Sequence, residues 1–165
     1  MKSIIIFLLF TFTCLNVNCQ TDKKFNYESN QNDTHFKILL KSEKPISKEA
    51  KSVYPRFLNQ RQVDSTYVSI IEKSILPEKL QRLNDRRAGF CFILFSLSGK
   101  VVSIKFSIQK EFIDLFSDDD LYTLYENLRR FEMDMSKIEI IYPEYWVEGT
   151  EAIFNLFIPL PLQQK

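Results

Sequence analysis

The most constraining feature of the sequence is a pair of β-rich runs in the middle of the chain. Residues 90–97 and 100–108 are dominated by phenylalanine, isoleucine, valine and leucine, and only Ser98-Gly99 separates them. Two such runs joined by a short glycine-containing turn predict an antiparallel β-hairpin. A two-residue turn pairs, on one side, Cys91 with Phe106, Ile93 with Ile104 and Phe95 with Val102. That side is apolar and the other is mixed, as in a hairpin with one face against a core. A longer turn would shift the register.

Two helices are predicted, one on each side of this hairpin in the chain. Apolar residues at helical spacing predict a first helix that is capped by Asp64 or Ser65 and ends before Pro77. Ser117 is predicted to cap the second helix, whose first turn holds three aspartates, where the helix dipole favours negative charge. The apolar stripe of this second helix consists of Leu121, Leu124, Tyr125 and Leu128.

Three shorter apolar runs predict the strands that complete the sheet. They span residues 36–40, 138–141 and 152–158, and the last one is closed by Pro159 and Pro161. The order of the elements predicts a single α+β domain over residues 36–165. The expected architecture is a small antiparallel sheet with a central hairpin and two helices packed on one face.

The N-terminus predicts a signal peptide over residues 1–19. Lys2 precedes an apolar run that starts at Ile4 and is shorter than the roughly 20 residues needed to cross a bilayer. Cleavage before Gln20 predicts an exported protein, periplasmic or associated with the cell surface, with no stable transmembrane span after signal removal. The alternative is a lipoprotein with a lipid anchor at Cys19. Residues 20–35 are polar and predict a flexible leader.

The composition excludes two classes of function. The chain contains 15 phenylalanines, which need a packed interior, and only three glycines, which leave little room for a phosphate-binding loop. Removing Lys2 with the signal peptide lowers the 22 basic residues to 21, equal to the 21 acidic residues. Proteins that bind nucleic acid usually carry a basic excess, so nucleic acid is not expected as a partner.

No catalytic, cofactor-binding or metal site is predicted. The only histidine, His35, lies in the polar leader, so a Ser-His-Asp or Cys-His arrangement lacks a positioned imidazole. Cys91, flanked by phenylalanines, is expected in the core. The contiguous residues Asp118, Asp119 and Asp120 favour helix capping, because calcium loops alternate their ligands around a glycine. The protein is therefore predicted not to be an enzyme, with an acidic pair for glycoside hydrolysis left open.

The candidate binding residues are Tyr142, Tyr145 and Trp146. They lie in the segment Tyr142-Pro143-Glu144-Tyr145-Trp146, a predicted loop that holds the only tryptophan. Exposed aromatic rings of this kind stack on sugars or anchor a protein partner. The alternative is that Trp146 fills the end of the core between the second helix and the last strand.

The region from residue 60 to 162 resembles the TonB C-terminal domain family of Gram-negative envelopes. The resemblance lies in Tyr67–Pro77, in Gly89–Val101, in the later helix and in Ile158-Pro159-Leu160, which are similar to the family's helix, proline, glycine-led strand, glycine turn and closing strand. It implies a periplasmic or surface domain of similar fold that docks onto another protein, rather than one that transduces energy.

Two functional hypotheses follow. In the first, the protein is an exported envelope protein and a non-catalytic interaction module, which binds another envelope protein by adding a strand to an open sheet edge. In the second, it is a surface carbohydrate-binding or carbohydrate-processing domain that uses the loop of Tyr145 and Trp146.

Overall fold

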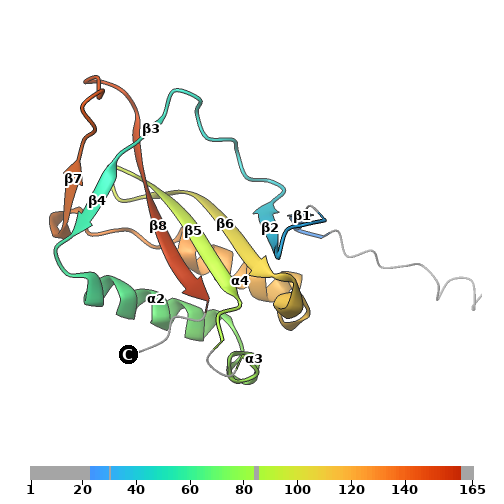
Figure 1. The fold of residues 1–165 in the computed structure, drawn as a ribbon. Helices are drawn as coiled ribbons and strands as arrows, with labels where there is room; N and C mark the ends of the chain where they lie inside the picture. The colour runs from blue at the N-terminus through green and yellow to red at the C-terminus, as the bar shows by residue number, and fades with distance from the viewer. Residues whose placement is uncertain (1–22, 30, 84–85, 161–165) are drawn as a thin grey trace, which may run out of the picture.

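The computed structural model describes residues 23–29, 31–83 and 86–160 and has a mixed α+β fold, which confirms the predicted class (Figure 1). The predicted signal peptide, with Cys19, lies outside the described residues. The strands are β1 (Phe25–Glu28), β2 (His35–Leu40), β3 (Lys51–Ser52), β4 (Tyr54–Phe57), β5 (Gly89–Ser96), β6 (Val101–Gln109), β7 (Ile138–Ile141) and β8 (Ala152–Leu160). The helices are α2 (Gln60–Ser74), α3 (Pro77–Gln81) and α4 (Asp118–Arg129), with short 3-10 helices at Lys110–Leu115 and Met135–Lys137.

The sheet is larger than the sequence predicts. Its six strands follow the order β1-β2-β6-β5-β8-β3, and β4 pairs with β7 in a separate antiparallel ribbon. All neighbours in the large sheet are antiparallel except β3 and β8. In the part of the chain that is described, no helix combines the length and apolar character needed to span a membrane.

Residues 25–28 correct the prediction of a flexible leader over residues 20–35. They form β1 at the edge of the sheet, and the Phe25 side chain is only 2% exposed. Its ring lies 6.1 Å from that of Phe106 and 6.4 Å from that of Tyr125, both edge-on. The buried Phe25 ring, the partly buried Tyr27 and the pairing to β2 therefore hold a segment whose other residues are polar.

The predicted hairpin is confirmed, with one change of register. Cys91 faces Phe106 and Ile93 faces Ile104, but Phe95 faces Val101 because the register shifts after Leu94. The predicted pairing of Phe95 with Val102 is therefore wrong. Arg129, at the end of α4, donates from Nη1 to the carbonyl oxygens of Val101 at 2.6 Å and Val102 at 2.8 Å. These bonds satisfy peptide groups at the bulge, a stabilisation that comes from outside the hairpin.

The core lies between the sheet and the two long helices. Alternate side chains of β5, β6 and β8 join one buried cluster with α2 and α4, and α4 lies behind β5 and β6 in Figure 1. Ser117 caps α4 as predicted, in a capping box with Asp120. The predicted cap of the first helix is wrong, because α2 begins at Gln60 with Asn59 as its N-cap. The first turn of α2 is polar, so the apolar periodicity starts too late to reveal it.

Candidate functional site

The exposed apolar side chains of the described residues gather in one place. Nine large hydrophobic side chains are exposed, and six of them lie on β4, β7 or the residues that adjoin these strands. Clusters of this kind mark interaction sites more often than singly scattered residues do. We call this cluster, together with the neighbouring Trp146, the ribbon surface: Tyr54, Leu58, Ile141, Tyr142, Tyr145, Trp146 and Val147.

The pairing of β4 with β7 creates the strand part of the ribbon surface. Tyr54 and Ile141 stand directly opposite each other and are 58% and 46% exposed. Side chains alternate along each strand, so Phe57 and Ile138 point the other way and pack against the core. The inward residues anchor the ribbon, and the outward ones stay exposed.

The ribbon also carries charged and apolar side chains at its centre and far end. Arg56 and Glu139 are cross-strand partners, and their side chains form an ion pair of 3.2 Å on the outer face. Leu58 follows β4, is 65% exposed, and its N–H donates to the Lys137 carbonyl oxygen at 2.9 Å. The outer face is thus apolar at both ends with one ion pair between them.

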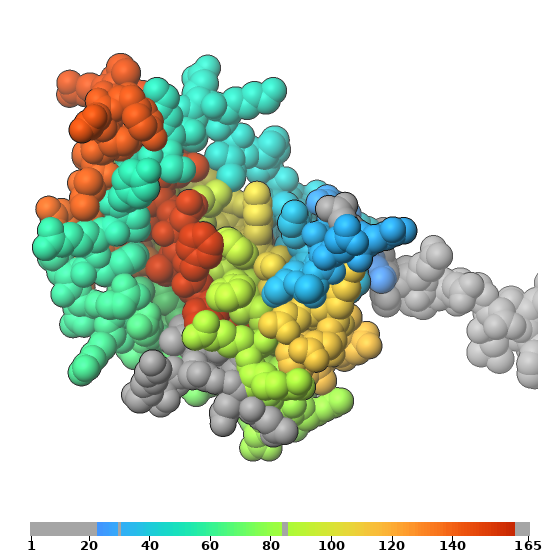
Figure 2. Space-filling model, viewed as in Figure 1, coloured from blue at the N-terminus to red at the C-terminus, as the bar shows by residue number. Residues whose placement is uncertain are grey.

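The loop after β7 carries the three predicted binding residues, which the fold brings together. Tyr142 is 46% and Tyr145 67% exposed, and the loop projects in orange at the upper left of Figure 2. Trp146 is half-buried, packs against the core and lies 4.9 Å from the Tyr142 ring at an angle of 49°. Its backbone N–H donates to the Pro143 carbonyl oxygen at 2.9 Å, which holds the loop in a turn.

Four members of the ribbon surface are not among the binding residues predicted from the sequence. Val147 directly follows the predicted aromatic segment, and Ile141 ends a strand that was predicted correctly. Tyr54 and Leu58 reach the site only because β4 pairs with β7, which lies more than 80 residues later in the chain. The sequence offers no more for Tyr54 than a tyrosine followed by a proline.

The outer edge of β8 is a second open feature. The pairing of β3 with β8 ends at Ser52 and Ile153, after which the chain continues into β4 and pairs with β7. The Val53 N–H donates to the Ile153 carbonyl oxygen at 2.8 Å, so alternate peptide groups of β8, at Asn155 and Phe157, point away from β5. Among the described strands, residues 154–160 pair with β5 alone. Pro159 belongs to this outward set, where a strand tolerates proline because no ladder bond is lost.

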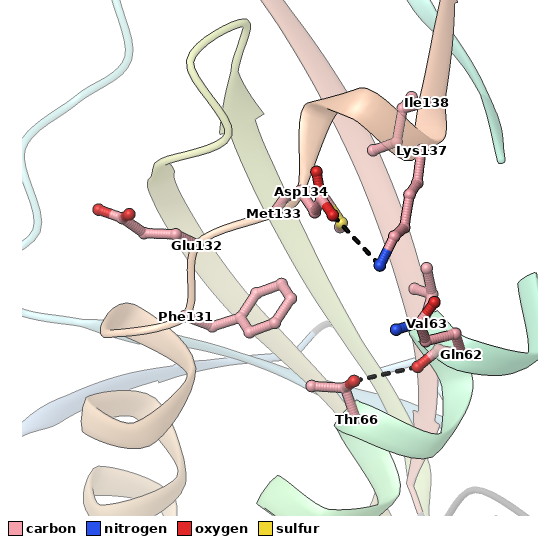
Figure 3. A pocket seen from close by; sticks show the side chains of 9 residues that line it. All are labelled: Gln62, Val63, Thr66, Phe131, Glu132, Met133, Asp134, Lys137 and Ile138. Atoms are coloured by element: carbon pink, nitrogen blue, oxygen red, sulfur yellow. Dashed lines mark hydrogen bonds and ion pairs between the residues drawn. The ribbon is translucent and has the colours of Figure 1, made fainter. Parts of the chain in front are cut away.

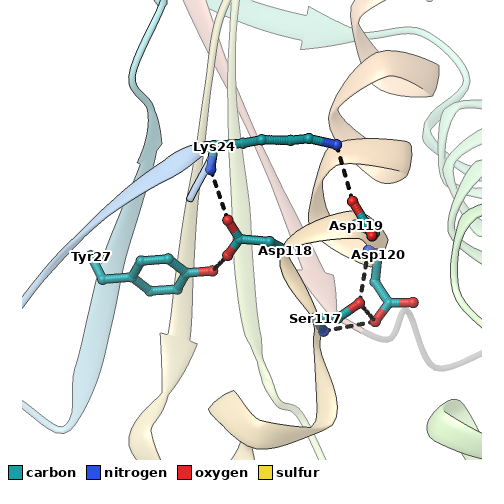
Figure 4. A network of polar contacts seen from close by, with 6 residues as sticks. All are labelled: Lys24, Tyr27, Ser117, Asp118, Asp119 and Asp120. Carbon is teal, nitrogen blue, oxygen red and sulfur yellow. Dashed lines mark hydrogen bonds and ion pairs between the residues drawn. The ribbon is translucent and has the colours of Figure 1, made fainter. Parts of the chain in front are cut away.

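The three aspartates at the start of α4 are engaged by the protein itself (Figure 4). Asp118 accepts hydrogen bonds from the Lys24 N–H at 2.8 Å and from the Tyr27 hydroxyl, and Asp119 pairs with Lys24 Nζ at 3.0 Å. Burial, followed by the hydrogen bond to Asp118, raises the pKa of Tyr27. These contacts tie β1 to α4. No group of His, Cys, Asp and Glu side chains within the described ranges has the arrangement of a metal site.

Asp120 completes the capping box. Partial burial tends to raise its pKa, but hydrogen bonds from Lys79, and from the hydroxyl and N–H of Ser117, outweigh burial and hold the pKa below its usual range. The carboxylate therefore serves helix α4 and its contact with α3.

A small pocket lies between the start of α2 and the segment that leads into β7 (Figure 3). Val63, Phe131 and Ile138 line it, and an ion pair of 3.2 Å between Lys137 and Asp134 stands at its rim. Its volume is about 110 Å³. This is smaller than the engineered cavity of about 150 Å³ that binds benzene, so the pocket is a shallow hollow beside α2.

The only histidine and the buried cysteine lie on different strands. Cys91 is 1% exposed on β5, and burial, with a smaller effect from the charge of Glu43, raises the pKa of its thiol. His35 is on β2, where Nδ1 lies 2.7 Å from the Thr34 hydroxyl. Because β6 separates β2 from β5, the two residues are roughly 10 Å or more apart, too far for a Cys–His pair.

Comparison with known proteins gives similarity to solved structures and no match in sequence. No protein-family model matches the sequence, and no curated protein matches it. The chain is similar to a solved DUF5043 family protein from Bacteroides uniformis ATCC 8492, at 10% sequence identity and a TM-score of 0.49, over 86% of this chain and 94% of that one. Function is therefore inferred from the surface of this chain.

Proposed function

We propose that the protein is exported to the cell envelope and acts there as a non-catalytic interaction module, binding another envelope protein through the ribbon surface. The observation that carries the proposal is the gathering of six of nine exposed large hydrophobic side chains on one ribbon and its loop. Three of the six are tyrosines, a residue type enriched where binding energy is concentrated. Export comes from the signal-peptide pattern, and docking agrees with the sequence resemblance to TonB C-terminal domains.

Strand addition at β8 is the second way in which such a module would bind. The outward peptide groups of Asn155 and Phe157 supply donors and acceptors, and the Phe157 side chain is 58% exposed, with its ring 4.7 Å from that of Phe92. An extended segment paired here would use main-chain hydrogen bonds for affinity and neighbouring side chains for specificity. Pro159 limits the pairing to the part of β8 before it.

The test is an affinity pull-down from native envelopes with residues 20–165 as bait and mass spectrometry as the readout. The ribbon variant carries Tyr54→Ala with Tyr145→Ala, and the matched control carries Leu76→Ala with Leu97→Ala, two exposed residues elsewhere. We expect a specific envelope protein that the control retains and the ribbon variant loses. Circular dichroism of each variant verifies that the fold is kept.

A proline at Asn155 separates the two modes of binding. Asn155→Pro removes an outward N–H from an exposed position and leaves the ladder to β5 intact. Loss of the partner with this variant alone assigns docking to the β8 edge, and loss with the ribbon variant alone assigns it to the ribbon surface. A partner retained by both variants would refute both modes.

Carbohydrate binding is the alternative function, and the exposure of Tyr145 is the observation that favours it. The tilt of Trp146 against Tyr142 leaves Tyr145 as the ring most available for stacking on a sugar. A glycan array probed with the chain and with Tyr145→Ala tests this function. Glycan binding that survives the substitution would count against the loop as the binding site.

A further inference from the structure

The loop side of the ribbon surface is locally acidic, whereas the side formed by β3 and β4 carries the basic residues Lys51 and Arg56. Residues 138–151 contain four glutamates and no lysine, arginine or histidine, although the whole chain has a net charge of only +1. Arg56 neutralises Glu139, whereas Glu144, Glu148 and Glu151 are exposed. None of these three forms an ion pair with any described residue. The backbones of Lys51 and Glu151 are hydrogen-bonded, with the Lys51 N–H donating to the Glu151 carbonyl oxygen at 2.9 Å, but the two side chains form no ion pair.

We infer that the partner of the ribbon surface is a basic protein segment. Its apolar or aromatic side chains contact Tyr54 and Tyr145, and its flanking lysines or arginines pair with Glu144, Glu148 and Glu151. This inference rests on the proposed function and adds the chemistry of the partner to it. An apolar centre with a charged rim is the usual anatomy of an interface, and opposite charge across the rim selects the partner and speeds its approach.

The same charges argue against three other occupants. Two copies of this chain joined through their ribbon surfaces would bring unpaired glutamates together, and like charges across an interface are costly. An anionic lipid surface would be repelled for the same reason. A neutral sugar would bind the rings but would leave all three carboxylates without a partner.

The test is a selection from a phage-displayed library of random peptides about twelve residues long, a length that suits an extended recognition segment. The library is selected on residues 20–165 and on three variants of that chain. One carries Glu144→Gln, Glu148→Gln and Glu151→Gln, and one carries Tyr54→Ala with Tyr145→Ala. The matched charge control carries Glu28→Gln, Glu72→Gln and Glu78→Gln, all exposed and distant in sequence from the loop.

We expect the unmodified chain and the charge control to enrich peptides that combine lysine or arginine with apolar residues. For synthetic versions of these peptides, fluorescence anisotropy should show binding about tenfold weaker with the Glu144, Glu148 and Glu151 variant. The affinity should also fall between about 50 mM and about 500 mM salt, because rim charges are screened.

Two results would overturn the inference, and they differ in what they mean for the proposed function. Enriched peptides without basic residues, lost only with the Tyr54 and Tyr145 variant, would leave the ribbon surface as a docking site and refute the basic partner. Enrichment that neither variant reduces, or no enrichment at all, would refute both.

Discussion

Replacing Gly89 with alanine should disrupt the junction of β5 and β6. Gly89 is the first residue of β5, and a Cβ atom there would lie 1.9 Å from the Ser107 carbonyl oxygen and 2.9 Å from Ile108 Cα. An ordinary contact for a Cβ is 3.4–4 Å, and both obstacles are backbone atoms that no rotamer change can move. The strands would have to separate locally by about 1.5 Å, the difference between 1.9 and 3.4 Å.

The expected loss of stability follows from this separation of the strands. The Gln109 N–H donates to the Ala88 carbonyl oxygen at 2.7 Å, and this bond lies where β5 and β6 must part. On the other side of β5, the Ala88 N–H donates to the Leu160 carbonyl oxygen of β8 at 2.6 Å, a bond that a shift of β5 would also disturb. Losing one or two such bonds costs about 1 kcal/mol each. Overpacking costs about 1–3 kcal/mol, and the reduced entropy of the unfolded chain returns about 0.4–1 kcal/mol. The free energy of unfolding should fall by roughly 2–4 kcal/mol.

Urea unfolding followed by far-UV circular dichroism measures this change. The control is Gly149→Ala, since Gly149 has a φ of +86° but nothing within 4 Å of an added Cβ. Its cost is the backbone strain alone, about 1 kcal/mol. A Gly89→Ala protein within about 0.5 kcal/mol of the unmodified chain, or more stable than Gly149→Ala, would refute the close-contact reasoning.

Three further predictions concern α4 and the core. Ser117→Ala removes the acceptor of the Asp120 N–H and the hydroxyl donor 2.6 Å from its carboxylate, and should lower the free energy of unfolding by about 1 kcal/mol. Asp120 has a lowered folded pKa, so its stabilisation is present above the unfolded pKa of about 3.9 and is lost as the pH falls through the folded pKa. The stability difference from Asp120→Asn should therefore shrink below about pH 4, and a constant difference would contradict this. Cys91 should resist iodoacetamide at about pH 8 until the chain unfolds, and native labelling within about tenfold of the rate in urea would contradict its burial.

Local chemistry explains which elements were predictable from the sequence. The alternation of Cys91 and Ile93 with their neighbours, together with a two-residue turn, suffices for most of the hairpin register. Ser117 and Asp120 stand three residues apart and form a capping box wherever the chain becomes helical. Strand β7 has the predicted bounds because its apolar run is short and ends at a tyrosine and a proline.

Other elements depend on partners far along the chain. Phe25 makes β1 a strand only because Phe106 and Tyr125 provide a buried site for its ring. The bulge after Leu94 is stabilised by Arg129, which lies outside the hairpin. Neither contact can be read from residues close in the sequence, because both form only when helix α4 packs on the sheet.

The candidate site combines both kinds of information. The aromatic loop can be recognised without the fold, since Tyr142, Tyr145 and Trp146 are close neighbours between a strand and a glycine turn. The folded structure is needed to show that Tyr54 lies beside this loop, opposite Ile141, and that Leu58 lies at the far end of the same ribbon. The position of Tyr54 follows from the burial of Phe57 and Ile138 on the inner side of the ribbon, which turns Tyr54 and Ile141 outward. The pairing of strands distant in sequence is set by the surface they bury together, a quantity that exists only in the folded chain.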